Sequence, residues 1–336
     1  MSTQPLLEVR GLTTSFFTSR GEVQAVRGVN FDVLAGEIVG IVGESGSGKS
    51  ITCMSILRLL KSNGRVVQGH AKFEGANLLE LSEHEMRKLR GDDIAMIFQD
   101  PMTSLNPTLT VGEQIIETII THRGSSRKAA RQRVVELFEL VKIPEAASRL
   151  SSYPHEFSGG MRQRVMIAMA LSCDPKLLIA DEPTTALDVT IQRQILLLLK
   201  EIQSRLGMAI ILITHDLGVI AEVADRILVM YGGMVMETGE VNTIFAAPTH
   251  PYTQGLLASV PKLRTANKER LRPIPGSPPD MLRPPIGCPF APRCVHAMEI
   301  CVEQVPPTFD MADQELHQTK CWLHHPDAPK NSEDAA

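Results

Sequence analysis

The sequence predicts an α/β fold whose core is a parallel β-sheet covered by helices. The first observation is an alternation of strand-like and helix-like runs along residues 176–231, which is typical of parallel strands joined by crossover helices. The second is an apolar run at 38–42 that leads through a glycine-rich loop into a stretch with helical spacing of apolar residues. Both features predict strands that alternate with helices.

The composition is that of an ordinary globular protein. Of the 336 residues, 43% are hydrophobic and 21% are charged, so the chain is long enough for one large domain and an extension. No apolar stretch approaches the roughly 20 residues of a membrane-spanning helix, and the first residues lack the layout of a secretion signal. A formal net charge of −4 gives no support to nucleic-acid binding. We therefore expect a cytosolic protein whose thiols stay reduced.

Two regions flank the parallel core. Residues 5–36 carry two β-rich runs separated by a short polar segment, which predicts an antiparallel sheet. Residues 82–145 are more polar and are predicted to be helical. The apolar positions expected to share one helix face are Val134, Val135, Phe138 and Val141.

The end of the chain differs in composition from the rest. Fifteen of the 22 prolines lie at or beyond residue 248, so this part cannot be mostly helix or central strand. Residues 326–336 are polar and are predicted to be disordered.

The glycine-rich loop matches the pattern of a phosphate-binding loop, G-x-x-x-x-G-K-[ST]. It follows an apolar strand and opens a helix, where backbone N–H groups and the helix N-terminus can bind phosphates. Lys49 is expected to reach the β and γ phosphates, and the Ser50 hydroxyl is expected to bind Mg²⁺. The predicted nucleotide-binding residues here are Gly43, Glu44, Ser45, Gly46, Ser47, Gly48, Lys49, Ser50 and Ile51.

A second candidate element is an apolar strand that ends in two acidic residues, Asp181 and Glu182. Such a pair can be simply the solvent end of a buried strand. Asp181 also lies at the carboxyl edge of the predicted parallel sheet, where such folds bind ligands, and it would hold Mg²⁺ there, usually through water. Glu182 would then accept a proton from the attacking water.

A third element places Ser158, Gly159 and Gly160 just before a long helical run. Alone, this tripeptide is more often a simple helix cap. Here it precedes the acidic strand by the length of one helix, and the segments TTALD and ITHD follow in order. This ordered set, spanning residues 5 to about 245, resembles the nucleotide-binding domain of ABC ATPases.

The resemblance implies that ATP and Mg²⁺ bind between two such domains paired head to tail. Gly43–Ser50 corresponds to Walker A, Asp181 to Walker B, and Ser158–Gly160 to the signature. Each ATP would be bound by Walker A of one subunit and by the signature of the other, where missing side chains allow close backbone approach. The signature departs from the commoner L-S-G-G-Q at Phe157 and Met161, but the Ser-Gly-Gly that would face phosphate is intact.

Further roles follow from the same resemblance. Gln99 corresponds to the Q-loop, Ala186–Asp188 to the D-loop and His215 to the switch histidine near the γ-phosphate. Phe16 is the expected aromatic for stacking on adenine, with Phe17 as the alternative. The implied catalytic residues are Glu182, His215 and Gln99, the implied Mg²⁺ ligands are Ser50, Gln99 and Asp181, and Asp188 is an implied nucleotide-binding residue.

The spacing and number of the ATPase motifs distinguish among types of ABC protein. Repair ATPases insert a very long coiled coil between Walker A and the signature, whereas Lys49 and Ser158 are only 109 positions apart. Ribosome-acting types carry two ATPase domains in one chain, and this chain has one. The segment around and after Gln99, IFQDPMTSLNPTLTVGEQI, and the segment HPYTQGLLASVP resemble the oligopeptide and dipeptide importer subfamily, which also handles nickel.

This subfamily resemblance implies an ATP-hydrolysing importer subunit, peripheral on the cytoplasmic face of the membrane. Its expected partners are a second ATPase subunit, often a related chain that forms a heterodimer, two transmembrane permease subunits and, indirectly, a solute-binding protein. The alternative is a soluble ABC ATPase with no transporter. The expected domains are an ATPase domain at 5–247, with a helical subdomain at about 100–175, an extension at 248–325 and the tail.

Four cysteines gather in the extension: Cys288, Cys294, Cys301 and Cys321. Their C-x₅-C-x₆-C-x₁₉-C spacing lacks the tight pair of most zinc ribbons. The subfamily resemblance implies a [4Fe-4S] site, and a metal would stabilise an extension without a core of its own. Zinc is the alternative, with His296, His324 or His325 as substitute ligands, and four unrelated reduced thiols are a third reading. Cys53 and Cys173 are expected in the core.

Overall fold

The computed structural model describes residues 4–99, 104–184, 187–259, 273–311 and 316–328. The chain forms two compact units that interleave along the sequence. Unit 1 comprises Met1–Glu8, Asp32–Val39 and Ala71–Thr214, and unit 2 comprises Val9–Phe31, Gly40–His70 and His215–Ala336.

The sheet of unit 1 contains three parallel strands in the order β8, β7, β6. They span Ile94–Ile97 (β6), Leu177–Asp181 (β7) and Ala209–Ile213 (β8). Every residue of β7 and β8 is buried, as expected for parallel strands covered on both faces. The prediction of helix throughout 82–145 is wrong for β6, because its run of four apolar residues is too short to be distinguished from a helix segment by periodicity.

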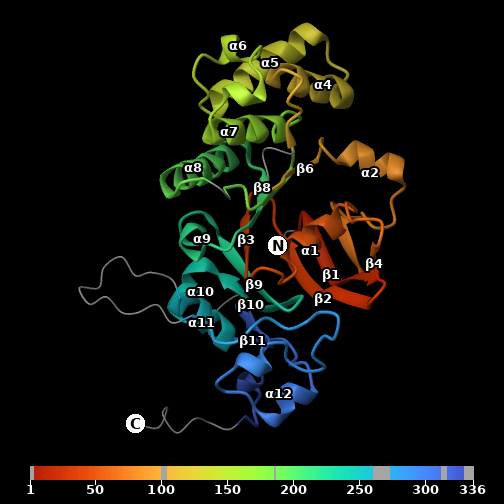
Figure 1. The fold of residues 1–336 in the computed structure, drawn as a ribbon, viewed down its shortest axis with the longest axis vertical. Coiled ribbons are helices and arrows are strands. Elements are labelled where there is room, and N and C mark those ends of the chain that lie inside the picture. The colour runs from red at the N-terminus through yellow and green to blue at the C-terminus, as the bar shows by residue number, and fades with distance from the viewer. Residues whose placement is uncertain (1–3, 100–103, 185–186, 260–272, 312–315, 329–336) are drawn as a thin grey trace, which may run out of the picture. The chain divides into compact units, whose positions relative to one another are not determined.

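The helices in the described residues of unit 1 are α2 (Glu83–Leu89), α4 (Val111–Arg123), α5 (Arg127–Leu140), α6 (Ala146–Arg149), α7 (Gly159–Ala170), α8 (Val189–Leu206) and the short η1 (Pro154–Glu156). Helices α4, α5 and α7 contact one another and lie together in Figure 1. The apolar face predicted for α5 is confirmed, since Val134, Phe138 and Val141 are fully buried. Val135 is half-buried.

Unit 2 contains the strand and helix that flank the glycine-rich loop, β3 (Ile38–Val42) and α1 (Lys49–Ile56). In this unit the strands follow one another as β3, β9, β10, β12 and β11. β9 (Arg226–Tyr231) and β10 (Met234–Glu240) form an antiparallel pair. Where the proline-rich part of the chain is described, its strands are β11 (Phe309–Asp310) and β12 (Gln318–Thr319), of two residues each, and β12 pairs with β10.

The other helices in the described residues of unit 2 are also short. They are α9 (Leu217–Val223), α10 (Val241–Ala246), α11 (Pro251–Ala258), α12 (Glu299–Glu303), η2 (Ala291–Arg293) and η3 (Trp322–His324). None of the helices in the described ranges is long and apolar enough to cross a membrane. The tail predicted to be disordered, 326–336, lies outside the described residues from 329 onward.

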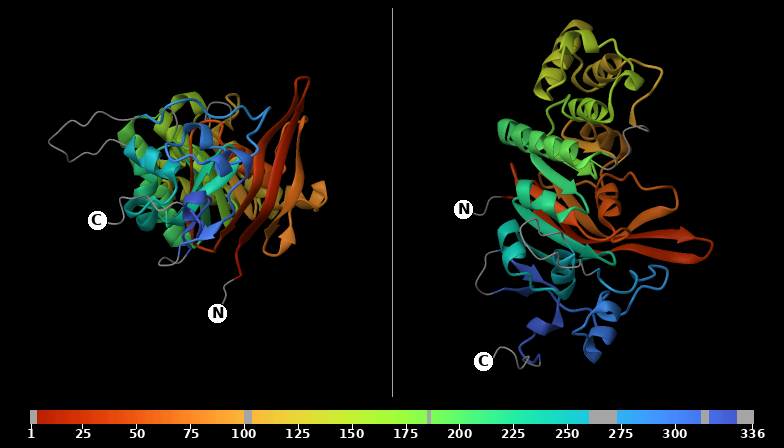
Figure 2. Two further views of the ribbon diagram at one scale, coloured as in Figure 1. Left: turned by 90° about the horizontal axis from the view of Figure 1, so that it is seen from below. Right: turned by 60° about the vertical axis from the view of Figure 1, so that its left-hand side comes forward.

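A long pair of strands opens the chain, β1 (Leu7–Thr18) and β2 (Gly21–Val33), and Figure 2 shows them side by side. The Gly11 N–H donates to the Asn30 side chain over 2.8 Å, and the Gly28 N–H donates to the Thr13 hydroxyl over 3.1 Å. Because position 11 faces 30 and position 13 faces 28, the pair is antiparallel. The predicted antiparallel sheet at 5–36 is therefore confirmed, and β4 (Gly64–Phe73) and β5 (Ala76–Asn77) extend the strand set.

A buried carboxylate fastens the proline-rich extension to β10. Glu237 is fully buried, and its Oε1 accepts hydrogen bonds from the Thr249 N–H and hydroxyl, both over 2.7 Å, and lies 2.8 Å from His317 Nε2. Its Oε2 accepts from the His250 N–H over 3.1 Å. Burial alone would raise the pKa of Glu237, but hydrogen bonds, among them those from Thr249 and His317, outweigh it and the pKa is lowered.

Replacing Glu237 by Gln is expected to destabilise the protein by roughly 3–5 kcal/mol, because it breaks a buried charged network. Since the folded-state pKa lies below the unfolded value, the stabilisation is present above about pH 4.5 and is lost as the pH falls through the folded value. Urea unfolding followed against pH measures both effects. Glu240→Gln on the same strand, where the side chain is exposed, is the control, and equal midpoints for the two variants would contradict the expectation.

Candidate functional site

The glycine-rich loop joins β3 to α1 through backbone that needs glycine. Gly43 has φ +150° and Gly48 has φ +100°. A Cβ added to Gly43 would lie 2.1 Å from the Met230 carbonyl oxygen, and one added to Gly48 would lie 2.5 Å from the Ala25 carbonyl oxygen. Since both neighbours are backbone atoms, the loop tolerates no side chain at these positions.

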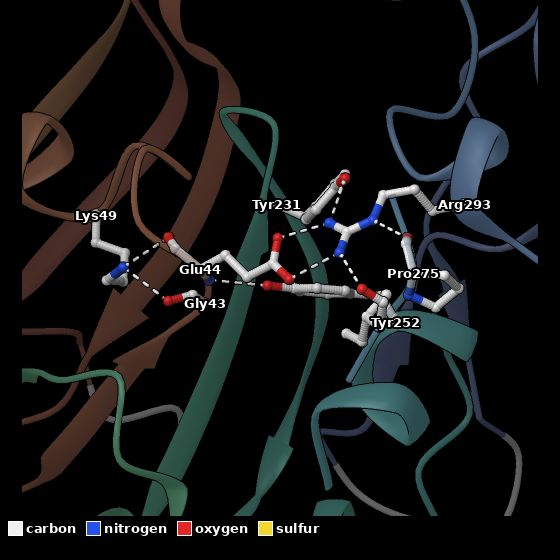
Figure 3. A network of polar contacts seen from close by, with 8 residues as sticks. Gly43, Glu44, Lys49, Tyr231, Tyr252, Pro275 and Arg293 are labelled. Carbon is white, nitrogen blue, oxygen red and sulfur yellow. Dashed lines mark hydrogen bonds and ion pairs between the residues drawn. The ribbon is translucent and has the colours of Figure 1, made fainter. Parts of the chain in front are cut away.

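Two polar side chains of the loop, Ser47 and Lys49, are buried. Lys49 is 6% exposed, and its Nζ donates to the carbonyl oxygens of Gly43 (2.8 Å) and Glu44 (3.0 Å), as Figure 3 shows. The buried hydroxyl of Ser47 has no hydrogen-bond partner among the described residues. A buried hydroxyl without a partner costs free energy that a bound ligand atom can recover. The loop therefore fits a phosphate group, with the amino end of α1 behind it.

The acidic pair lies at the carboxyl end of β7. Asp181 is 3% exposed, and Glu182 follows it with φ +46°, a strained conformation for a residue with a side chain. The Glu182 N–H donates to the Ile213 carbonyl oxygen over 2.9 Å, which fixes this turn against β8. Gln99 Nε2 donates to Glu182 Oε2 over 2.8 Å. The structure thus brings together Gln99 and Glu182, which sequence separates by 83 positions.

The serine and two glycines lie at the start of α7. The Ser158 hydroxyl accepts from the Met161 N–H over 3.4 Å, so this serine is also the cap of the helix. A Cβ on Gly160 would lie 2.8 Å from Ile191 Cγ2, so a side chain there would require Ile191 to shift. Asp188 caps α8 by accepting from the Ile191 N–H over 3.0 Å. Of the D-loop positions, Ala186 lies outside the described residues.

The remaining predicted residues belong to unit 2. His215 is exposed and is followed by Asp216, which caps α9. Phe16 is half-buried, and a Cβ added to Gly64 would lie 2.6 Å from Cε1 of its ring. Phe17 is 40% exposed, and the Arg65 guanidinium lies 4.4 Å from the centre of its ring. Which phenylalanine stacks on adenine stays a prediction.

Unit 1 therefore carries one group of candidate residues and unit 2 another. The first group is Gln99, Ser158, Gly159, Gly160, Asp181, Glu182 and Asp188, and the second is Phe16, Gly43–Ile51 and His215. Glu182 in the first group and Gly43, Gly46 and Gly48 in the second have positive φ.

The four clustered cysteines line one small cavity in unit 2, together with His250 and His296. Burial raises the pKa of Cys288 to about 11 and that of Cys321 to about 12. All six cysteines lie in the described ranges and none forms a disulfide there, and Cys53 and Cys173 are buried as expected. Within the described residues, no group of three or more His, Cys, Asp or Glu side chains is arranged to hold a metal ion.

The histidines proposed as substitute ligands differ in their surroundings. His296 lines the cysteine cavity, whereas His324 hydrogen-bonds the Thr249 carbonyl oxygen over 3.0 Å through Nε2. His325 packs against the rings of Phe309 and Trp322. His250 also lines the cavity, although the sequence analysis did not identify it as a possible ligand. The sequence feature that could have identified it is its position in the segment HPY.

Comparison with known proteins gives matches along most of the chain. The family model described as ABC transporter matches residues 26–185, and the one described as oligopeptide/dipeptide transporter, C-terminal region, matches residues 236–301. The chain is 58% identical over 326 residues to the oligopeptide transport ATP-binding protein OppD of Bacillus subtilis (strain 168), covering 97% of this chain and 90% of that protein. It is 55% identical over 321 residues to the dipeptide transport ATP-binding protein DppD of the same organism, covering 95% of each.

Solved structures agree on the fold. The dimeric post-hydrolysis structure of the ATP-binding cassette MJ0796 bound to ADP and Pi has a TM-score of 0.63 and 30% sequence identity, and it matches 70% of this chain and 98% of its own. The α/β fold of an ABC ATPase cassette, with parallel and antiparallel sheets, is thereby confirmed. High identity along nearly the whole length of two curated relatives decides the family. The chain belongs to the oligopeptide and dipeptide transport ATP-binding proteins of the ABC family, which are ATPases that use ATP and Mg²⁺.

Proposed function

We propose that this chain hydrolyses ATP to energise the import of oligopeptides or dipeptides. The observation that carries the proposal is identity of 50–58% along nearly the whole chain to proteins whose names specify peptide transport, with the C-terminal region matched as well. That region is additional to the general ABC cassette, so the match is to the importer type and not to the ATPase alone. The relatives offer no support for a soluble ATPase without a transporter.

Within the site, we assign phosphate binding to the loop of unit 2. Lys49 would exchange its two loop carbonyl contacts for the β and γ phosphates, and the Ser47 hydroxyl would gain a partner. Ser50, Gln99 and Asp181 are the residues that would hold Mg²⁺. When bound, Mg²⁺ neutralises the charge that develops on the phosphates.

Hydrolysis is assigned to Glu182, Gln99 and His215. Glu182 accepts a proton from the attacking water, and the hydrogen bond from Gln99 Nε2 orients its carboxylate for this step. His215, exposed at the start of unit 2's last segment, would contact the γ-phosphate. Phe16 or Phe17 would stack on the adenine ring.

A second cassette completes each ATP site in this proposal. Ser158, Gly159 and Gly160 at the amino end of α7 would bind the γ-phosphate held by the partner's loop, and Asp188 would lie beside it. The similar structure of MJ0796 is dimeric and was bound to ADP and Pi, which supports a paired arrangement. We propose that the partner is a related ATPase chain, and that two permease subunits at the cytoplasmic face of the membrane and a solute-binding protein complete the importer.

We propose further that the four cysteines hold a [4Fe-4S] cluster. In support, all four thiols line one cavity, and the extension around them has little apolar core of its own. Four cysteine thiolates are the usual ligand set of a [4Fe-4S] cluster. Zinc remains the alternative that metal analysis decides.

Anaerobic purification is expected to give about four iron and four sulfide per chain with broad visible absorbance. Cys288→Ser should lose them, because it removes one of four ligands, and Cys173→Ser, which changes a buried cysteine away from the cavity, should keep them. One zinc per chain in place of iron would show that the four cysteines bind zinc and not a [4Fe-4S] cluster. Absence of any metal from the freshly purified protein would contradict a metal site.

The substrate class is tested by uptake of labelled dipeptides, longer peptides and nickel ion into cells that lack the chain. Restoring the chain should restore peptide uptake, and restoring Lys49→Ala should not. Restoration of nickel uptake alone would contradict the peptide assignment.

A further inference from the structure

Glu44 is an acidic residue inside a loop proposed to bind an anion, and all of its polar groups are engaged. Its N–H donates to the Tyr252 hydroxyl over 2.9 Å, and its carbonyl oxygen accepts from Lys49 Nζ over 3.0 Å. Its carboxylate pairs with Arg293, with NH1 to Oε2 at 2.6 Å and NH2 to Oε1 at 3.1 Å. Figure 3 shows these contacts meeting at Glu44.

Arg293 reaches the loop from the cysteine-containing extension, 249 positions later in the chain. Its side chain is only 5% exposed. Nε donates to the Pro275 carbonyl oxygen (2.8 Å), NH2 also donates to that of Ile274 (3.0 Å), and NH1 also donates to the Tyr231 hydroxyl (3.0 Å). Every guanidinium nitrogen is therefore bonded, and the two-pronged geometry toward the carboxylate is one that arginine supplies and lysine cannot.

Packed aromatic rings hold this arrangement in place. Tyr231 and Tyr252 are almost completely buried, with ring centres 4.5 Å apart, and each lies 5.3 Å from the Phe290 ring. Arg293 is three residues beyond Phe290, and its guanidinium lies 5.7 Å from the Tyr231 ring centre. Because rings packed in this way move little, the arginine is held at one place relative to the loop.

An unpaired carboxylate at position 44 would oppose the binding of phosphates by the same loop. Glu44 is only partly exposed, so water screens its charge incompletely. The Arg293 guanidinium neutralises this carboxylate and directs it toward the extension and away from the end of the loop that carries Lys49. The pair thus has a consequence for ligand affinity in addition to fastening the extension.

We infer that Arg293 is a positioning residue for ATP: by holding the Glu44 carboxylate, it lets the C-terminal extension set the nucleotide affinity of the loop. The inference rests on the proposed phosphate loop at Gly43–Ser50. The hydrogen bonds of Arg293 are made to Glu44, Tyr231 and two backbone carbonyls, and not to the cysteines that line the cavity.

The test compares full-length variants for the dissociation constant of a fluorescent ATP analogue and for the KM and kcat of ATP hydrolysis. Arg293→Gln should raise the dissociation constant and KM roughly tenfold, the size of one charged hydrogen-bonded pair, with kcat changed less than about twofold. Arg293→Lys, which keeps the charge but not the fork, should raise KM about threefold. The double variant Glu44→Gln with Arg293→Gln should recover most of the loss, because no unpaired carboxylate remains.

Two further variants serve as controls, one for loss of an ion pair elsewhere and one for the loop assignment. Arg127→Gln breaks the exposed ion pair with Glu113 and should change neither constant. Lys49→Ala should weaken binding strongly. If it does not, the loop assignment itself fails and the inference falls with it.

The inference is overturned if Arg293→Gln lowers thermal stability but leaves the dissociation constant and KM unchanged, because Arg293 would then only fasten the extension. Where Arg293→Gln does not fold, Arg293→Lys is compared with Glu44→Gln. A weaker affinity in the lysine variant alone supports the inference, and an equal loss in both variants overturns it.

Discussion

Replacement of Glu182 by Gln is expected to leave ATP binding intact and to lower steady-state hydrolysis by about 10²–10⁴-fold, the usual contribution of a general base. The amide cannot accept the proton of the attacking water. It retains an oxygen that can accept the hydrogen bond now made by Gln99 Nε2 over 2.8 Å, so the local geometry is preserved. The variant should therefore accumulate as a nucleotide-bound, paired form.

Phosphate release and nucleotide occupancy, measured on the same preparation, separate the two effects. Glu201→Gln is the matched control, because Glu201 is an exposed glutamate of α8 that pairs with Lys142 on the surface. Its hydrolysis should equal that of the original protein. Normal turnover by Glu182→Gln would show that another group accepts the proton.

Replacement of Gly43 by Ala is expected to weaken ATP binding by about 100-fold. The added Cβ would lie 2.1 Å from the Met230 carbonyl oxygen, and the φ of +150° is one that residues with side chains rarely adopt. The loop must shift by an ångström or so to relieve the contact, and misplacement on that scale costs about two orders of magnitude at a binding or catalytic site.

Gly124→Ala separates this clash from ordinary backbone strain. Gly124 also has positive φ, +61°, but a Cβ there would have no atom within 4 Å. It should cost about 1 kcal/mol of stability and leave ATP affinity unchanged. Equal ATP affinities in the two glycine variants would contradict the steric argument. Titration of each variant with labelled ATP gives the comparison.

The phosphate loop and the buried strands can be predicted from the sequence, because each is determined by neighbouring residues. The glycines at 43 and 48 need positive φ, and the strand before them and the helix after them have distinct periodicities, so the phosphate loop carries its own signature. The buried strand β8 is an unbroken apolar run, and β7 is apolar up to Asp181, because parallel strands covered on both faces are buried throughout.

Contacts between distant residues are not encoded in such patterns. Arg293 and Glu44 are 249 positions apart, and neither belongs to a periodic face, so nothing local indicates their pairing. Glu237 is a charged residue in a strand, where composition favours exposure, and only three-dimensional packing reveals its burial. The clustering of four cysteines in the sequence indicated that they lie near one another, and the structure places all four around one cavity.

ATP-driven peptide uptake by the assembled importer is measured most directly by following peptide transport and ATP hydrolysis in one sample. The chain, its ATPase partner, the permeases and the solute-binding protein are reconstituted in vesicles, and peptide accumulation and phosphate release are recorded together. Peptide should accumulate only with MgATP, in proportion to phosphate released, and both should stop with Glu182→Gln. Peptide accumulation without ATP, or unaffected by Glu182→Gln, would contradict the account.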